Sequence, residues 1–185
     1  MNGVIASELC GYGVRLRPIV PADLPSLRRW RNSDEVRLAM LTQTHISPAQ
    51  QRRWYQHIYA QPAQRHWCVE VQGIRAGYAN LKGFVDAPLN GQARADSGLY
   101  LGQTRVRHGL LAIAVALCQL DAAFEQLDIT TIETQVKADN HSALRLNRML
   151  GYQSVTHIDE WLTLTLTAQP YFAARHHLMR FFRHV

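Results

Sequence analysis

The feature that most constrains the fold is a strand–helix–strand pattern in the last third of the chain. Residues 129–136 are rich in Ile and Thr, which favours a β-strand. Residues 140–150 predict a helix that ends at Gly151, because a left-handed C-cap prefers glycine. Residues 153–158 and 161–167 then predict a closing hairpin. Such an ending requires helices packed on a sheet, which favours a mixed α/β fold over an all-helical or all-β one.

The remaining elements follow from helical and period-two patterns in the rest of the chain. Ser47, Pro48 and Gln50 form a helix start in which serine is the N-cap and proline takes the first helical position. Strands are expected at residues 14–17, 66–72, 74–84 and 96–101, and helices at residues 22–31, 34–40, 47–58, 108–127 and 170–183. The order β-α-α-α-β-β-β-α-β-α-β-β predicts an α/β (α+β) fold with a central, mostly antiparallel mixed sheet of about seven strands flanked by helices. Because no repeat or linker is visible, residues 1–185 are expected to form a single domain.

Composition points to a cytoplasmic protein. Hydrophobic residues make up 47% of the 185, which is enough for a core. The N-terminus lacks a basic segment followed by an apolar run, so no secretory signal is expected. The longest apolar run, Gly109 to Cys118, is about half of what a membrane span needs. Cys10, Cys68 and Cys118 are far apart and lack metal-ligand spacing, so we expect free thiols in a reducing compartment and no metal.

The formal net charge of +6 favours an anionic partner. Nucleic acid is not expected, because the arginines are scattered and no zinc-finger, RNP or basic-zipper pattern occurs. A phosphate-bearing cofactor or a nucleotide-linked substrate would also benefit from this charge. The charge alone does not decide between these partners.

The segment from Asn140 to Tyr152 resembles the N-x-x-A/S-x-x-x-Y-x-x-x-G-F/Y element of the GNAT acetyltransferases. Its place, after a strand and before another strand, is also where that family has it. The resemblance implies the GNAT fold and an enzyme, an acyl-CoA N-acyltransferase, with acetyl-coenzyme A (acetyl-CoA) as its cofactor. In isolation the same segment is also compatible with a plain amphipathic helix that has a cap and a glycine stop.

The basic turn at residues 105–109, which precedes the long helix, lies where the family binds pyrophosphate with the pattern Q/R-x-x-G-x-G/A. Backbone N–H groups and the dipole at a helix N-terminus attract phosphate oxygens. The match is imperfect in both registers. Either Leu110 takes the place of the first glycine, or Gly109 takes it and Val106 stands where glutamine or arginine is usual. An exposed basic loop is the alternative.

The resemblance implies a set of cofactor-binding residues on the fourth predicted strand, the basic turn and the helix at 140–150. They are Leu99, Tyr100, Leu101, Arg105, Val106, Arg107, His108, Gly109, Leu110, Leu111, Ala112, Asn140, Ser142 and Asn147. In this family the fourth strand separates from the fifth, so that the pantetheine arm pairs with its free backbone. Asn140 is equally well explained as a helix cap.

Acetyl transfer to an amine requires a neutral amine and a stabilised oxyanion. Asp96 lies where several family members place an acidic base, and its alternative role is that of a surface carboxylate. A backbone N–H between Leu99 and Gly102 is expected to meet the oxyanion. Many members have a tyrosine acid where this chain has Asn147, and asparagine supplies no proton at neutral pH. We therefore assign no catalytic acid.

The first half resembles GNAT enzymes that acetylate nucleotide-linked amino sugars, of the pseudaminic acid pathway type. The matching residues are Trp30, Arg31, Asn32, Val36, Arg37, Met40, Ile46, Ser47, Trp54 and, on the fourth strand, Gly98, Leu99 and Tyr100. Acetyltransferases of ribosomal-protein N-termini share much of this layout and are the second interpretation. A GNAT-like module that binds coenzyme A without catalysis is the third.

A small-molecule amine acceptor would meet residues of the turn between the first two helices and of the third strand. The expected substrate-binding residues are Trp30, Arg31, Asn32, Tyr78 and Asn80. The indole of Trp30 would stack on a base or sugar, and Arg31 would meet a diphosphate. Trp30 is also at the spacing of a core residue.

Two further expectations concern surfaces and histidines. The C-terminal hairpin and an aromatic tail are expected to form a homodimer contact; the tail residues are Tyr171, Phe172, Phe181 and Phe182. His66 and most other histidines are interpreted as scattered surface or packing residues.

Overall fold

The computed structural model describes residues 8–106 and 108–182. The strands are β1 (Leu9–Gly11), β2 (Val14–Pro18), β3 (Gln64–Val71), β4 (Ile74–Gly83), β5 (Arg94–Leu101), β6 (Thr131–Lys137), β7 (Gln153–Ile158) and β8 (Trp161–Thr167). The helices are α1 (Leu24–Asn32), α2 (Asp34–Arg37), α3 (Pro48–Tyr59), α4 (Leu111–Asp121), α5 (His141–Met149) and α6 (Ala168–Leu178).

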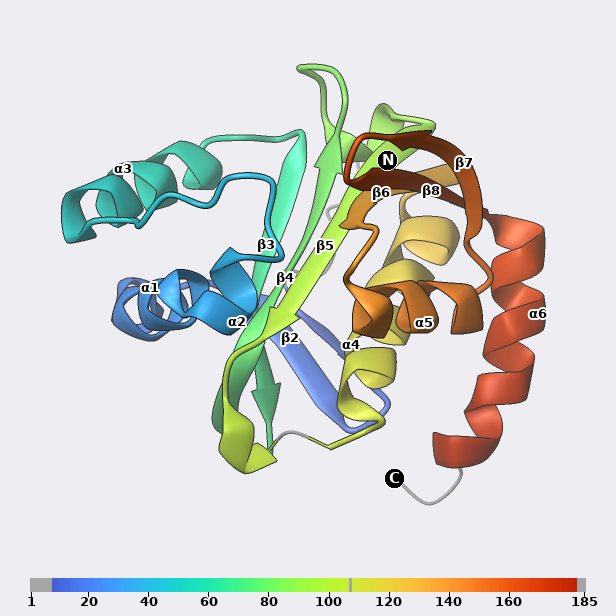
Figure 1. Ribbon diagram of the computed structural model, residues 1–185, viewed down its shortest axis with the longest axis horizontal. Helices are drawn as coiled ribbons and strands as arrows, with labels where there is room; N and C mark the ends of the chain where they lie inside the picture. Colours follow the sequence, from blue (N-terminus) through green and yellow to red (C-terminus); the bar gives the residue numbers. More distant parts are fainter. Residues whose placement is uncertain (1–7, 107, 183–185) are drawn as a thin grey trace.

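The described strands form one eight-stranded sheet in the order β1-β2-β3-β4-β5-β6-β8-β7. Only β5 and β6 run parallel, and all other neighbours are antiparallel. Figure 1 shows α1, α2 and α3 on one side of the sheet and α4, α5 and α6 on the other. The predicted fold class is confirmed, with one strand more than expected.

Local sequence explains most element boundaries. Ser47 caps α3 in a reciprocal capping box with Gln50, as predicted. Gln72 and Gly73 both have positive φ angles, which a type I′ turn between β3 and β4 requires. Gly151 has a φ of 95° after α5, and a Cβ there would lie 2.8 Å from the Pro170 carbonyl oxygen. This position therefore requires glycine.

Three predictions about element lengths were wrong. The short strand β1 was missed, since three residues are too few to show a period of two. The helix α2 ends at Arg37 rather than residue 40. The helix α4 begins at Leu111 because residues 108–110 form a turn in which the Leu111 N–H donates to the His108 carbonyl over 3.1 Å. It ends at Asp121, and residues 122–126 continue as a π-helix.

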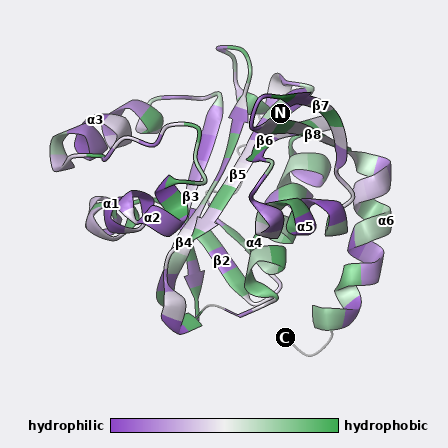
Figure 2. Ribbon diagram, viewed as in Figure 1, coloured by the Kyte–Doolittle hydropathy of each residue, from purple (hydrophilic) through white to green (hydrophobic). Residues whose placement is uncertain are grey.

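Two apolar clusters hold the helices to the sheet. The larger lies between the sheet and α4, most of whose residues are buried. The smaller lies under α1 and α3, around Leu27 and Trp30. Figure 2 shows the same contrast, because α4 is largely hydrophobic in colour whereas α3 carries many hydrophilic residues.

The pairing of β5 with β6 stops early. Only three residue pairs form, the last of them Asp96 with Glu133, and the Thr134 hydroxyl then donates to the Ser97 carbonyl over 3.0 Å. From there to Leu101 the pairing with β4 continues while the other edge of β5 is open. The expected separation of the fourth predicted strand from the fifth is therefore present.

A polar network docks α6 onto α4. The Tyr171 hydroxyl lies 2.6 Å from Asp121 Oδ1 and 3.2 Å from the Leu117 carbonyl oxygen. Arg175 lies 2.9 Å from the same carboxylate. Tyr171 and Phe182 are 0% and 8% exposed, so the prediction that they belong to a dimer contact was wrong: both are core residues. Phe172 and Phe181 remain exposed.

Replacing Tyr171 by phenylalanine is expected to lower the free energy of unfolding by about 1–3 kcal/mol, since the hydrogen bond of the hydroxyl to the charged Asp121 is lost. Chemical denaturation measures this change. His177→Ala on the exposed side of the same helix is the control and should stay within about 0.5 kcal/mol of the wild type. An equal effect of both variants would contradict the role given to the hydroxyl.

Candidate active site

A cleft of about 1800 Å³ passes through the opening between β5 and β6. On one side it is bounded by α2, the loop that follows it and the start of α3. On the other side it reaches α4 and α5. The cleft therefore connects the two faces of the sheet at the point where the strands separate.

The floor of the cleft is a row of side chains on the α1–α3 face of β4 and β5. Residues directly opposite each other in an antiparallel pair point to the same face. Tyr78 is opposite Tyr100, and Lys82 is opposite Asp96. Between these pairs, Asn80 is opposite Gly98. The register thus settles that Tyr78 and Asn80 face the cleft.

Asn80 depends on Gly98 for its place. A Cβ at Gly98 would lie 2.7 Å from Asn80 Oδ1. Asn80 is 4% exposed, and its Nδ2 has no hydrogen-bond partner among the described residues. A buried amide donor without a partner costs free energy, so it is a candidate for contact with a bound molecule.

Asp96 is at the last residue pair before the strands separate. Burial raises the pKa of the Asp96 carboxyl, and the neighbouring Lys82 opposes the shift. A carboxylate with a raised pKa is a better proton acceptor near neutral pH. The adjacent Glu133 is held by an ion pair with Arg94 instead. Asp96 therefore suits the role of a base better than its neighbour does.

Tyr78 belongs to a hydrogen-bonded chain that sequence reasoning missed. Its hydroxyl lies 2.6 Å from His66 Nδ1, and His66 Nε2 lies 2.8 Å from Gln64 Oε1. Trp54 packs edge-on against the His66 ring. Period-two alternation on β3 places Gln64 and His66 on one face, but the register with β4 was needed to bring them to Tyr78.

Arg31 lines the cleft, as expected for a substrate-binding residue. Its Nη2 donates to the Thr42 carbonyl, while Nη1 is buried without a hydrogen-bond partner among the described residues. Burial lowers the pKa of Arg31. Arg31 therefore borders the cleft and carries one donor that the fold leaves unpaired.

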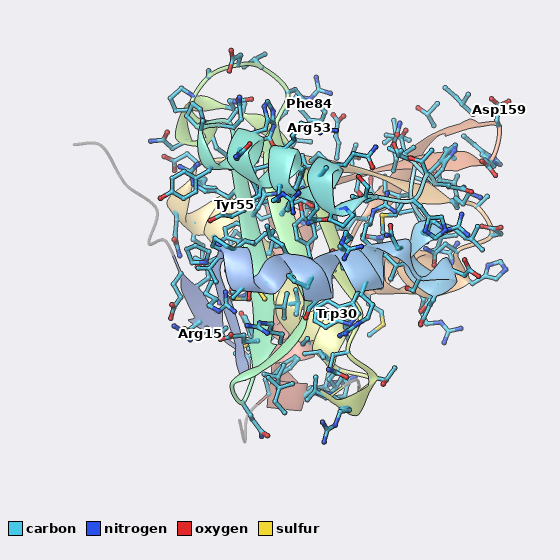
Figure 3. The ribbon with its side chains drawn as sticks, turned by 90° about the vertical axis from the view of Figure 1, so that its left-hand side faces the viewer. Arg15, Trp30, Arg53, Tyr55, Phe84 and Asp159 are labelled. Atoms are coloured by element: carbon cyan, nitrogen blue, oxygen red, sulfur yellow. The ribbon has the colours of Figure 1, made fainter. Side chains whose placement is uncertain are left out.

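Asn32 and Trp30 have structural roles. The Asn32 side chain makes two hydrogen bonds to the Ile46 backbone, of 2.9 and 2.8 Å, and so holds the loop between α2 and α3. Trp30 is buried in the smaller cluster, where a Cβ at Gly102 would lie 2.0 Å from its Cγ. Figure 3 views the face carrying α1 and α3, with Trp30 on α1. Neither residue lines the cleft. Both make their contacts with other parts of the fold instead.

The open edge of β5 presents unpaired backbone donors. Along an antiparallel strand, successive N–H groups point to alternate sides. The Gly102 N–H donates to the Ala76 carbonyl over 3.0 Å, on the β4 side. The N–H groups of Leu101 and Leu99 therefore point to the side that β6 has left. Gly102, which the sequence had included as an oxyanion donor, is excluded because its N–H is engaged.

The residues expected at the cofactor fall into three groups. Those that line the cleft are Leu99, Tyr100, Leu101, His108, Gly109, Ala112, Asn140, Ser142 and Asn147. Those outside its lining are Arg105, Val106, Leu110 and Leu111. Arg107 lies outside the described residues.

The N-terminus of α4 opens into the cleft through Ala112 and Ile113. A Cβ on Gly109 would meet no atom within 4 Å, so space remains in front of this turn. Together with the free edge of β5, this arrangement fits a cofactor that has both phosphates and an extended amide-bearing arm.

On α5, the two asparagines bond to the helix itself. Asn140 Oδ1 accepts from the Ala143 N–H over 3.1 Å, which is the cap role. Asn147 Nδ2 donates to the Ala143 carbonyl over 2.9 Å. Tyr152, a cleft residue that the sequence reasoning did not include, has its hydroxyl 2.9 Å from Ser97 Oγ. Burial raises the pKa of Tyr152 well above its ordinary value.

Two features are absent from the described residues, a metal-binding cluster and a membrane-spanning helix. Residues 8–106 and 108–182 contain no group of three or more His, Cys, Asp or Glu side chains arranged to hold a metal. None of the helices in these ranges has the length and apolarity required to cross a bilayer.

A family model described as an acetyltransferase (GNAT) domain matches residues 14–153. The chain therefore belongs to the GNAT acetyltransferase family, and it is an acetyl-CoA-dependent N-acetyltransferase. A search of curated protein sequences finds no significant match.

Solved structures share the fold at low sequence identity. Spermidine N-acetyltransferase from Vibrio cholerae, in complex with CoA and spermine, is 17% identical over 88% of this chain and 99% of its own, with a TM-score of 0.76. RimJ from Mycobacterium smegmatis, in complex with CoA-disulfide, is 18% identical over 96% and 94%, with a TM-score of 0.71. The N-acetyltransferase PseH from Campylobacter jejuni, in complex with acetyl-CoA, is 15% identical over 84% and 99%, with a TM-score of 0.64. At these identities the likeness establishes the fold and not the acceptor.

Proposed function

We propose that this enzyme transfers an acetyl group from acetyl-CoA to the primary amine of a nucleotide-linked amino sugar. The observation that carries the choice of acceptor is Arg31, which lines the cleft and whose buried Nη1 has no hydrogen-bond partner among the described residues. A guanidinium N–H in this state favours an anionic oxygen, and a nucleotide diphosphate supplies several. The stacked rings of Tyr78 and Tyr100, 5.1 Å apart, lie on the same side of the sheet.

The donor half of the site would be held by α4 and β5. The N-terminus of α4, at Ala112, would bind the phosphates, and the N–H groups of Leu99 and Leu101 would hold the extended arm and the carbonyl oxygen. Acetyl-CoA supplies the acetyl group as an activated thioester. Asn140, Ser142 and Asn147 border the same half of the cleft.

Asp96 would accept the proton from the acceptor amine. A simple alkylammonium has a pKa of about 10.4, so most of it is protonated at neutral pH and a base is useful. Asp96 is half-buried at the junction of the two halves of the cleft, where the amine must meet the thioester. We assign no residue as the acid, because Asn147 supplies no proton.

The acceptor class is tested by a thiol-release assay with acetyl-CoA. UDP- and dTDP-linked amino sugars are compared with N-terminal peptides and with simple alkylamines. Turnover of the nucleotide-linked amines at the lowest KM supports the proposal. Preference for peptides would contradict it and favour the second candidate.

Arg31→Met is expected to raise the KM of a nucleotide-linked amine by about 10-fold or more, since a hydrogen bond to a charged group contributes roughly 1.5–3 kcal/mol. The KM of a simple alkylamine should not change, which separates lost recognition from a disturbed loop. Arg29→Met is the matched control, because Arg29 is exposed on the same helix and outside the cleft. An equal loss for both acceptors would contradict the assignment.

Acetylation of a protein or peptide α-amine is the second candidate. Asp34 and Glu35 also line the cleft and carry the charge that a peptide ammonium needs. The peptide arm of the assay above decides between the two acceptors.

Three further points remain proposals. We infer a cytoplasmic location, since Cys10, Cys68 and Cys118 are free cysteines. We infer that residues 1–185 act as one domain, because strands from Leu9 to Thr167 join one sheet. We also propose that a homodimer forms through the C-terminal hairpin, because Val155 and Ile158 on the edge strand β7 are exposed.

A further inference from the structure

A half-buried chain of three side chains ends at the cleft. Tyr78 lines the cleft, whereas His66 does not and lies behind it, with Trp54 packed on its ring. Gln64 forms the far end of the chain. His66 therefore has no direct access to a bound acceptor and can act on one only through Tyr78.

The hydrogen bonds fix the tautomer of His66. Gln64 Oε1 is an acceptor, so the His66 Nε2 that lies 2.8 Å away carries the proton. In a neutral imidazole the other nitrogen is then an acceptor. Burial, with smaller contributions from Lys82 and His57, lowers the pKa of His66 to about 3, so the ring is neutral at physiological pH.

The tautomer in turn fixes the direction of the Tyr78 hydroxyl. Its hydrogen must point to His66 Nδ1, 2.6 Å away. Burial, followed by nearby Tyr100 and Asp96, raises the pKa of Tyr78 well above its ordinary value, so the hydroxyl stays protonated. With its hydrogen committed, the Tyr78 oxygen can only accept a hydrogen bond from a molecule in the cleft.

We propose that His66 is a positioning residue, which makes the Tyr78 oxygen a hydrogen-bond acceptor for the N–H of the acceptor amine. The inference rests on the proposed acetylation of an amine. Neither Tyr78 nor His66 gives up a proton in this role. The proton leaves the amine toward Asp96, which lies on the same face of the floor as Tyr78, beyond Asn80 and Gly98.

The direction of the hydroxyl matters because an attacking amine has one lone pair and at least one N–H. A free phenol O–H would donate to that lone pair and block attack. An acceptor oxygen binds the N–H instead and leaves the lone pair directed away. The Gln64–His66 pair thus selects the productive one of two hydrogen bonds that Tyr78 could form.

A purely structural role predicts a different mutational pattern. If the chain only satisfied polar groups, His66→Leu would lower the melting temperature and the double variant would restore it, with no change in the kcat of the folded enzyme. If His66 orients the hydroxyl, then in His66→Leu the Tyr78 O–H is free to donate to the lone pair of the amine and lowers kcat. Removing that O–H by Tyr78→Phe should then raise kcat again. Whether kcat rises when Tyr78→Phe is added to His66→Leu therefore separates the two roles.

The experiment compares four variants: His66→Leu, Tyr78→Phe, the double variant and His66→Asn. We expect His66→Leu to lower kcat by about 10-fold with little change in the KM of the amine, because an unproductive bond of about 1.4 kcal/mol must be broken. Adding Tyr78→Phe should then raise kcat. His66→Asn, which retains an acceptor near the position of Nδ1, should be close to the wild type. His177→Leu is the matched control on an exposed histidine of α6.

Additive losses in the double variant, or a wild-type kcat in His66→Leu, would overturn the inference. Acetyl-CoA affinity by calorimetry and the melting temperature show whether each variant is folded. The ring ¹⁵N shifts of His66, measured by NMR on the wild type, provide a test that does not depend on activity. A neutral Nε2–H tautomer is expected, and an Nδ1–H tautomer would overturn the inference. If no amine is acetylated at all, the proposed function fails, and the NMR result decides the orientation separately.

Discussion

Replacing Asp96 by asparagine is expected to lower kcat/KM for the amine by about 100-fold or more, since a positioned base contributes about 10²–10⁴ to rate. The change removes the proton acceptor and keeps the size of the side chain. Acetyl-CoA affinity should be unaffected, because Asp96 is not expected to contact the phosphates. Steady-state kinetics and calorimetry on the same preparation give both quantities.

The same substitution should stabilise the protein at neutral pH. Burial raises the pKa of Asp96, so the folded state binds a proton more tightly than the unfolded chain. Stability linked to this group is therefore fully present below the unfolded pKa of about 3.9 and is lost as the pH rises through the folded pKa. Asparagine has no charge to bury, so Asp96→Asn should raise the melting temperature at pH 7. The gain should shrink toward pH 4.

The pH dependence of the rate completes this test. In the wild type, kcat/KM should fall on the acidic side as Asp96 becomes protonated, at a pH above that of an ordinary aspartate. This limb should disappear in Asp96→Asn. Glu133→Gln is the matched control, because Glu133 is opposite Asp96 but is paired with Arg94. An unchanged profile in Asp96→Asn would mean that another group is the base.

Those parts of the site that depend on local sequence could be predicted. The cap at Asn140 and the glycine stop at Gly151 follow from short-range rules, and both are present in α5. The position of Asp96 on its strand also followed, although its raised pKa depends on burial that only the fold supplies. The family resemblance correctly predicted that β5 would separate from β6.

The rest depends on contacts between distant residues. Helical spacing allowed Trp30 to be either a core or a cleft residue, and its contact with Gly102, seventy-two residues later, makes it core. Asn32 resembled a substrate ligand until its bonds to Ile46 were known. His66 looked scattered because its partner Tyr78 is brought to it only by strand register. Alternation and capping patterns report only on neighbours along the chain. They therefore cannot predict contacts between residues that the fold brings together from distant positions.

The second large effect concerns the cofactor half of the cleft. Replacing Ala112 by glutamate is expected to weaken acetyl-CoA binding by at least about 100-fold, since like charges about 4 Å apart repel by roughly 4 kcal/mol at an effective dielectric constant of 20. Ala112 is in the first turn of α4, is half-buried and lines the cleft. A carboxylate there would occupy the place proposed for the phosphates. Calorimetry with acetyl-CoA measures the loss.

Stability gives this prediction its control. A negative side chain in the first turn of a helix is favourable, contributing about 0.3–1 kcal/mol through the helix dipole. Ala112→Glu should therefore melt at the same temperature as the wild type or slightly above it, so that weak binding cannot be attributed to unfolding. Ala112→Gln has the same bulk without the charge and should bind acetyl-CoA much better than the glutamate variant. Equal losses in the two variants would show that size and not charge is responsible. Wild-type affinity in Ala112→Glu would place the phosphates elsewhere, and the N-terminus of α4 would then have no part in holding the cofactor.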